Sequence, residues 1–231
     1  MSDYTARPRV LEVLAPLQDA HLLDLGCGEG YVARLAAEAG AASVFGIDVS
    51  SEMIARANSA SAESAECPLE FVTGDASGPL KLPREKYERI SAVFLFNYLT
   101  RGEMARTMAS AREHIAPGGR FVFSVPHPCF PYMKKPGEPF FFETGGKDYY
   151  AAVDHTLEGK IWTVEGEAAD VRCVHKTFAD YFEAIRTAGW TALPRVEELG
   201  VTEEHIDLAP KFFEPLAGLP LHLLFVLEEP A

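Results

Sequence analysis

Three glycines beside acidic residues form the stretch of this sequence best suited to hold a ligand. Residues 21–30 read HLLDLGCGEG, in which a short apolar run leads into Gly26, Gly28 and Gly30. Glycine has no Cβ and readily adopts positive φ, so such a turn lets a ligand approach the backbone. Residues 31–39 are helix formers, and the free N–H groups at the start of that helix would favour an anionic group. The pattern predicts a strand, a ligand-binding turn and a helix.

Two carboxylates flank this turn. Asp24 precedes it within the predicted strand, and Asp48 ends the next apolar run, 22 residues after Gly26. A carboxylate at the end of a neighbouring strand is placed to accept hydrogen bonds from ribose hydroxyls. The glycines are spaced G-x-G-x-G, and Tyr31 stands where a dinucleotide fingerprint has its third glycine. We therefore expect a nucleoside ligand, and Tyr31 counts against an NAD-dependent oxidoreductase.

Two motifs together suggest a family. DLGCGEG at residues 24–30 and GIDVS at residues 46–50 resemble those of the class I S-adenosylmethionine (SAM) dependent methyltransferases, in particular small-molecule enzymes of the type 11 and type 12 kind. The resemblance covers residues 20–125 well and 177–229 more loosely. It implies SAM as the cofactor and S-adenosylhomocysteine as a product. The cofactor-binding positions it implies are Asp24, Gly26, Cys27, Gly28, Asp48, Val49, Met53, Asp75, Ala76, Phe94 and Asn97.

The resemblance also implies roles for individual side chains. Asp24 would orient the amino group of the cofactor, and Asp48 would bind the ribose hydroxyls. Asp75 would accept the adenine amino group, and Met53 would cover the adenine ring. Cys27 would act through its backbone alone.

The composition limits the possible partners. Among 231 residues, 21 Lys and Arg stand against 34 Asp and Glu, a formal net charge of −13. Nucleic-acid affinity depends on cationic contacts, so we expect no nucleic-acid partner. We also expect no membrane partner, because no apolar run reaches the roughly 20 residues that span a bilayer. The four cysteines show no C-x-x-C pairing, which predicts reduced thiols, no metal site and a cytoplasmic location.

Alternating apolar runs and helical patterns predict how these residues are positioned. The predicted strands are 21–25, 43–49, 69–73, 90–96, 120–125, 190–197 and 221–227, and the predicted helices are 8–17, 31–39, 51–57, 101–115 and 178–188. This alternation is typical of a doubly wound α/β protein with a parallel sheet. The resemblance implies a Rossmann-like seven-stranded sheet of order 3-2-1-4-5-7-6 with its last strand antiparallel.

The regular pattern breaks after the fifth strand. Residues 126–170 are dense in prolines and aromatic side chains, and long segments of this kind are usually lids or binding loops. Within and just beyond them, 160–164 and 170–175 read as a hairpin. We expect one methyltransferase domain over residues 1–231, with 126–170 inserted as a substrate lid. An aromatic dimer contact is the alternative, so the protein is a monomer or a homodimer.

Several side chains near predicted strand ends are candidates for chemistry on an acceptor. His127 follows the fifth strand and His175 ends the hairpin, and either histidine would serve as a general base near neutral pH. His155 is a weaker candidate of the same type. The predicted substrate contacts are Tyr98, Tyr149 and Tyr150.

These observations predict a SAM-dependent enzyme that methylates an oxygen or nitrogen of a small molecule. An aromatic lid over the sheet edge would enclose a modest ligand and exclude water. One alternative is a methyltransferase acting on a protein or peptide terminus, which would need an open acidic groove. Another is a SAM-binding protein without catalysis, which would bind SAM but yield no S-adenosylhomocysteine.

Overall fold

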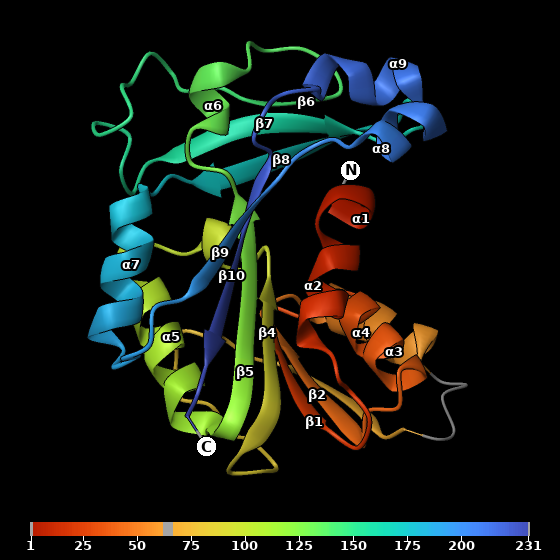
Figure 1. Cartoon of the computed structure of the whole chain (residues 1–231), viewed down its shortest axis with the longest axis vertical. Coiled ribbons are helices and arrows are strands. Elements are labelled where there is room, and N and C mark those ends of the chain that lie inside the picture. Colours follow the sequence, from red (N-terminus) through yellow and green to blue (C-terminus); the bar gives the residue numbers. More distant parts are fainter. Residues whose placement is uncertain (1, 62–66, 231) are drawn as a thin grey trace.

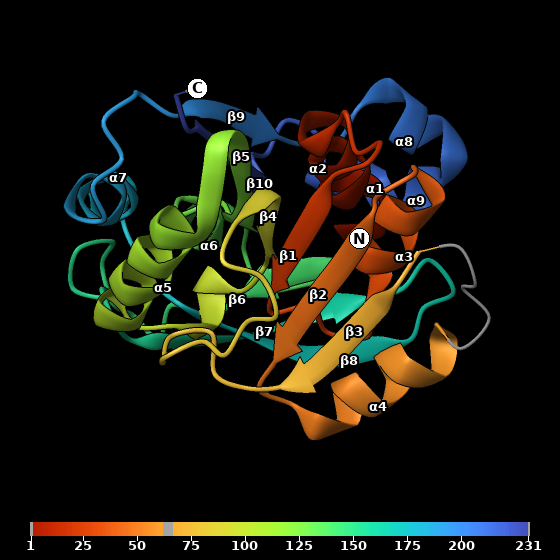
Figure 2. The ribbon, with the colours of Figure 1, turned by 90° about the horizontal axis from the view of Figure 1, so that it is seen from below.

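Seven strands form the central sheet of the computed structural model, which describes residues 2–61 and 67–230. Its strands are β1 (His21–Leu25), β2 (Ser43–Asp48), β3 (Leu69–Thr73), β4 (Tyr87–Val93), β5 (Ile115–Pro126), β9 (Arg195–Leu199) and β10 (His222–Glu228). They lie in the order β3-β2-β1-β4-β5-β10-β9, and β10 runs antiparallel to both of its neighbours (Figures 1 and 2). Counted along this sheet alone, the order is 3-2-1-4-5-7-6, so the predicted Rossmann-like fold is confirmed.

Helices cover both faces of the sheet (Figure 1). They are α1 (Ser2–Thr5), α2 (Arg7–Leu14), α3 (Tyr31–Glu38), α4 (Ser51–Ala60), α5 (Arg101–His114) and α7 (Phe178–Thr187). Strand alternation supplies both layers: Leu224 and Val226 pack with α2 and α3, while Leu223 and Phe225 pack with α5 and α7. Both faces of the central strands are therefore buried, as expected from their continuous apolar runs.

Side-chain caps begin the helices α4, α5 and α7. The Ser50 hydroxyl accepts a hydrogen bond from the Met53 amide at the start of α4. Thr100 and Glu103 form a capping box at α5, and Thr177 forms one at α7. Such caps satisfy amides that have no partner within the helix, so they fix where each helix begins.

Residues 127–176, which we call the insertion, form a second small sheet. The insertion contains α6 (Phe130–Met133), β6 (Phe140–Phe142), β7 (Thr156–Trp162) and β8 (Ala168–Val174). Its strands are antiparallel in the order β6-β7-β8, and this sheet lies across one end of the central sheet (Figure 1). The hairpin expected from the sequence is present, and β6 is an additional strand in a segment read as irregular. The remaining short helices are α8 (Glu203–Leu208), α9 (Pro210–Phe213), η1 (Phe96–Tyr98) and η2 (Glu214–Leu216).

Several sequence-based boundaries are wrong. The fifth strand begins at Ile115 instead of residue 120, and the hairpin strands are Thr156–Trp162 and Ala168–Val174. The fourth strand ends at Val93 instead of residue 96, because Phe94 adopts a positive φ of 56° and the chain turns into η1. The first long helix ends at Leu14, two residues before Pro16. The strand expected at 190–197 lies at Arg195–Leu199 instead, where it pairs with β10.

We expect Gly46→Ala to lower the free energy of unfolding by about 1–3 kcal/mol, the usual cost of overpacking. A Cβ on Gly46 would lie 2.7 Å from Phe71 Cδ1 and 2.8 Å from Cys27 Sγ, within the packing beneath the glycine turn. Gly102→Ala is the control, because its nearest atom would be Arg106 Nη1 at 3.7 Å and alanine favours helix. Urea unfolding measures both; equal stability of the two variants would contradict the close packing of Gly46.

Candidate active site

The glycine turn is hydrogen-bonded to the end of β2. Gly26, Gly28 and Gly30 have φ values of 71°, 55° and 77°, which side chains with a Cβ rarely adopt. The amides of Gly26 and Cys27 both donate to the carbonyl oxygen of Ile47, at 2.7 and 3.0 Å. The turn therefore exposes backbone at the carboxyl edge of the sheet, where open α/β folds bind ligands.

Asp48 adds a second connection between β2 and the turn. Its Oδ2 accepts a hydrogen bond from the Gly28 amide at 2.9 Å, and its Oδ1 accepts one from the Ser50 amide at 2.9 Å. A carboxylate has about four acceptor positions, so both oxygens keep the capacity to bind a hydroxyl group. Asp48 therefore supports the turn and stays available to a ligand.

Asp24 is buried, and only one of its two carboxylate oxygens has a hydrogen-bond partner among the described residues. Only 1% of its surface is exposed, and its Oδ1 accepts from Ser91 Oγ at 2.7 Å. Its Oδ2 is buried with no hydrogen-bond partner among the described residues. Burial raises the pKa of Asp24 from its ordinary value of 3.8 to about 7. An unpartnered buried carboxylate oxygen of this kind suits a cationic group of a ligand.

Asp24 and the turn line a small cavity of about 60 Å³. The complete lining is Arg7, Asp24, Gly26, Cys27, Gly28, Glu29, Tyr31, Val32 and Val93. Arg7 enters from α2, with its guanidinium 4.8 Å from the centroid of the Tyr31 ring. Burial raises the pKa of the Cys27 thiol, so this cysteine stays protonated and offers its backbone. We call this space the turn cavity.

The other predicted cofactor positions lie beyond the ends of β2 and β3. Val49 is 76% exposed, and Met53 is partly buried on the first turn of α4. Asp75 is exposed, and its Oδ1 accepts from the Ser77 amide at 2.8 Å. Ala76 is buried. None of the four lines the turn cavity or the cavity described next, and their role in cofactor binding stays a prediction.

A second cavity, of about 170 Å³, lies between the central sheet and the insertion, and we call it the acceptor cavity. From the core it is lined by Phe94, Asn97, Tyr98, Pro126 and His222, from the insertion by Phe140, Phe142, Ile161, Val171 and Arg172, and from α2 by Arg7. Arg7 lines both cavities, so the two spaces are adjacent. The insertion therefore covers the carboxyl edge of the sheet beside the glycine turn.

Two buried polar atoms border the acceptor cavity without a partner among the described residues, Asn97 Oδ1 and His222 Nδ1. The other imidazole nitrogen of His222 hydrogen-bonds Thr5 Oγ1 at 2.9 Å. Burial lowers the pKa of His222 to about 3, so the ring is neutral. His222 and Arg172 were not predicted from the sequence. His222 is the first residue of β10 and pairs with Pro126, a location that only the sheet register reveals.

The two predicted catalytic histidines lie outside the linings of both cavities. His127 is 3% exposed; its Nε2 contacts Glu198 Oε1 at 3.0 Å and its Nδ1 accepts from the Cys129 amide at 3.1 Å. His175 is 2% exposed and contacts the Tyr149 carbonyl oxygen at 2.9 Å through Nε2. Both rings are held by protein groups, and a catalytic role for either stays a prediction.

The three tyrosines predicted to contact the substrate lie in different surroundings. Tyr98 borders the acceptor cavity and is 50% exposed. Tyr149 packs edge to face against His175, and its hydroxyl accepts from the Phe178 amide at 3.2 Å. Tyr150 is 82% exposed. The structure brings Tyr98 alone of the three to the acceptor cavity.

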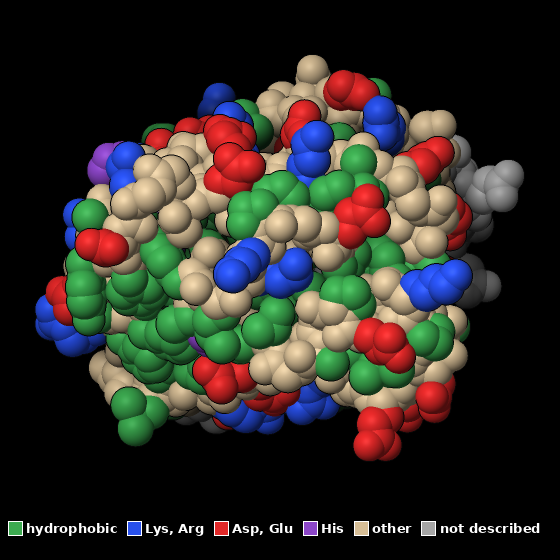
Figure 3. Space-filling model, turned by 90° about the horizontal axis from the view of Figure 1, so that it is seen from above, with side chains coloured by type: hydrophobic (Ala, Val, Ile, Leu, Met, Phe, Trp, Pro, Cys, Tyr) green, Lys and Arg blue, Asp and Glu red, His purple; other side chains and the backbone are tan. Residues whose placement is uncertain are grey.

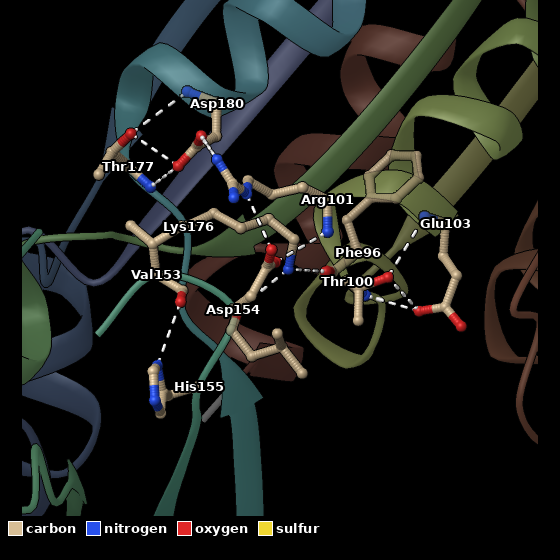
Figure 4. Close-up of polar contacts among 11 residues, drawn as sticks. Phe96, Thr100, Arg101, Glu103, Val153, Asp154, His155, Lys176, Thr177 and Asp180 are labelled. Atoms are coloured by element: carbon tan, nitrogen blue, oxygen red, sulfur yellow. Dashed lines mark hydrogen bonds and ion pairs between the residues drawn. The ribbon is translucent and has the colours of Figure 1, made fainter. Parts of the chain in front are cut away.

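A buried lysine attaches the insertion to the segment that carries Asn97 and Tyr98 (Figure 4). Lys176 is 1% exposed, and its Nζ donates to the carbonyl oxygens of Phe96 at 2.8 Å and Val174 at 2.9 Å. Burial lowers the pKa of Lys176 to about 8. These contacts join β8 to η1 across the cavity wall.

Arg101 makes a second, more exposed attachment beside this lysine (Figure 4). Its backbone amide and Nε donate to the two carboxylate oxygens of Asp154 at 2.9 and 2.8 Å. Its Nη1 contacts Asp180, the capping residue of α7, at 3.3 Å. The start of α5, the insertion and the start of α7 are therefore linked through one guanidinium group.

The outer face of the insertion carries mixed side chains. Figure 3 shows Lys and Arg scattered among Asp and Glu on this face, with hydrophobic patches between them. Its positive charge is not gathered into a continuous stripe of the kind that follows a phosphate backbone. In the part of the chain that the structure describes, no cluster of His, Cys, Asp and Glu has metal-binding geometry, and no helix is long and apolar enough to cross a membrane.

The geometry defines a Rossmann-like fold with a cavity on its glycine turn, and comparison with known proteins specifies it further. Residues 22–119 match the family described as a methyltransferase domain. A protein of Haemophilus influenzae is 30% identical over 139 residues, 55% of this chain and 50% of that protein. The trans-aconitate 2-methyltransferase of Streptomyces avermitilis is 35% identical over 133 residues, 54% of this chain and 47% of the enzyme. The chain spans about half the length of the curated relatives it matches.

Solved structures agree with this match. A SAM-dependent methyltransferase of Mesorhizobium loti superposes with a TM-score of 0.68 at 23% identity, over 96% of each chain. At this identity, the likeness concerns the fold. Residues 22–119 therefore match a methyltransferase domain, and the fold of the whole chain is that of SAM-dependent methyltransferases. The expectation of a SAM-dependent methyltransferase, with SAM as its cofactor, agrees with these matches.

We expect Asp24→Asn to raise the melting temperature of the cofactor-free protein more at about pH 8 than at about pH 5. Between its ordinary pKa of 3.8 and its native pKa of about 7, folded Asp24 keeps a proton that the unfolded chain has lost. Stability therefore falls as pH rises through this window, and asparagine removes the fall. Thermal unfolding at both pH values measures the effect; an equal shift at both would contradict a raised pKa.

Proposed function

We propose that this protein transfers the methyl group of SAM to an oxygen or nitrogen atom of a small molecule. The observation that carries the proposal is the adjacency of the two cavities, one on the glycine turn and one under the insertion, with Arg7 lining both. A transferred methyl group must lie close to and in line with its acceptor atom. The turn cavity and the acceptor cavity are both lined by Arg7, so a cofactor in one and an acceptor in the other would be close enough for this transfer.

The residues of the turn cavity fit the amino-acid end of SAM. The unpartnered Asp24 Oδ2 would accept from the α-ammonium group, and Arg7 would pair with the α-carboxylate. The bare backbone at Gly28, where a Cβ would meet no atom within 4 Å, leaves room for the chain between these groups and the sulfur. Asp48, at the end of β2, would accept hydrogen bonds from the ribose hydroxyls.

The acceptor cavity supports a small acceptor. Its volume of about 170 Å³ is below that of most drug-binding pockets, and its walls include the aromatic rings of Phe94, Phe140 and Phe142. A peptide terminus would require a groove that continues to the surface, and the insertion crosses this edge instead. The insertion would act as the lid, keeping water away from the transferred group.

Bound SAM supplies an electrophilic methyl group on a positively charged sulfur, so the protein itself has to bind, orient and exclude water. Asn97 and Tyr98 lie on η1, which Lys176 fixes against β8 through the Phe96 carbonyl. Their side chains would orient the acceptor toward the turn cavity. The four cysteines are free thiols, which agrees with a reducing cytoplasmic location. Whether the enzyme is a monomer or a homodimer stays a prediction.

We expect Asp24→Asn and Arg7→Gln each to weaken SAM binding by about tenfold or more, since each removes a charge-assisted hydrogen bond. Neither should change the affinity for 5′-methylthioadenosine, which lacks the amino-acid end. Asp48→Asn should weaken both ligands, because the ribose is common to them. Isothermal titration of each variant with each ligand measures this pattern.

Arg9→Gln provides the matched control. Arg9 lies on the same helix as Arg7 but pairs with Glu12 and Glu197, away from both cavities. It should bind SAM with unchanged affinity. Failure of the wild-type protein to bind SAM would disprove the proposed function, and an equal loss of both ligands in Arg7→Gln would disprove the orientation of the cofactor.

A further inference from the structure

The charge of the acceptor cavity is opposite to that of the protein. The chain carries a formal net charge of −13, yet the charged side chains that line this cavity are Arg7 and Arg172. Arg172 makes no hydrogen bond or ion pair within the described ranges. Its partner across the β7–β8 register is Glu158, and no ion pair joins them. An arginine beside an aromatic-walled cavity, without a carboxylate in the same lining, favours an anionic ligand.

His222 contributes a neutral donor to the same cavity. When Thr5 Oγ1 donates to one imidazole nitrogen, the other nitrogen carries the proton, and that atom is the unpartnered Nδ1. His222 is 2% exposed, so this N–H group has no access to bulk water. A carboxylate oxygen placed between Arg172 and His222 would satisfy both groups.

Among the described residues that line the cavity, none is suited to remove a proton, and burial raises the pKa of Tyr98. His222 borders it, but burial lowers the pKa of that ring to about 3. His127 and His175 lie outside the lining and contact Glu198 and the Tyr149 carbonyl oxygen. An alcohol or an ammonium group must lose a proton to become a good nucleophile, whereas a carboxylate is already ionised at neutral pH. An ammonium group would also be repelled by Arg172.

Building on the proposed function, we propose that the acceptor is a small carboxylic acid, anchored by Arg172 and His222, and that the product is its methyl ester. One carboxylate oxygen pairs with Arg172, and the other oxygen forms the new bond to the methyl carbon. The bond between that carbon and sulfur breaks, and its electron pair stays on sulfur. The negative charge of the acid and the positive charge of the sulfonium cancel, and no proton is released.

The experiment uses the purified chain, methyl-labelled SAM and three acids, namely succinate, trans-aconitate and benzoate. Phenol and benzylamine serve as the neutral and cationic counterparts of benzoate. We expect label to enter at least one acid and to be released as methanol by mild alkali, which cleaves esters but not ethers or methylamines. Arg172→Gln should raise the KM for that acid by about tenfold or more, the loss of one charge-assisted contact, with unchanged SAM affinity.

Two further variants separate recognition from general charge effects. Arg172→Lys keeps the positive charge and should recover part of the lost affinity. Lys160→Gln removes a positive charge from β7 outside the cavity lining and should leave the KM for the acid unchanged. Alkali-stable label on phenol or benzylamine alone would overturn the proposal, as would an unchanged KM in Arg172→Gln. If SAM binds but no acid is methylated, the carboxylate proposal fails while the proposed function stands; if SAM does not bind, the proposed function fails.

Discussion

The attachment of the glycine turn to the end of β2 is the constraint on which the rest of the site depends. Backbone amides of Gly26 and Cys27 share the Ile47 carbonyl, and the Gly28 amide binds the Asp48 carboxylate. The three glycines of the turn have positive φ and are conformationally free, so contacts with the neighbouring strand must fix the shape of the turn. The parallel register of β1 and β2 fixes the position of Asp48 relative to the turn that follows β1. The sheet therefore determines where the turn cavity opens.

The acceptor side is held by a different kind of interaction. Burying the Lys176 ammonium is unfavourable, and two backbone carbonyl oxygens compensate for the lost water. One of those carbonyls belongs to Phe96, on the η1 turn beside Asn97 and Tyr98. The insertion and the cavity wall are therefore joined by hydrogen bonds of the Lys176 ammonium group. Breaking them would expose this charge or leave it buried without a partner. The insertion is therefore attached firmly at this end, and Arg101 adds a second attachment beside the lysine.

The sequence was sufficient for the parts of this structure that depend on local pattern. Continuous apolar runs predicted the central strands, and capping residues such as Ser50 and Thr100 predicted where helices begin. The glycine turn and its acidic neighbours were found because their spacing is short and their chemistry specific. Arg172 and His222 were missed because each lies far along the chain from the turn, and only the strand order brings them near it. Arg7 was missed because the sequence pattern does not show that the start of α2 packs beside the turn. Three consecutive phenylalanines in β6 show no alternation, so that strand was missed as well.

Some buried polar atoms that lack a hydrogen-bond partner lie at the two cavities. Among the described residues, nine buried side-chain polar atoms lack a partner, and three of them, Asp24 Oδ2, Asn97 Oδ1 and His222 Nδ1, belong to residues that line the two cavities. Each such group costs a folded protein about 1–3 kcal/mol. Packing alone would favour replacing them, since apolar side chains of similar size have no such cost. Their positions are consistent with a site whose hydrogen bonds are completed by its ligands, so that binding restores stability that folding alone does not provide.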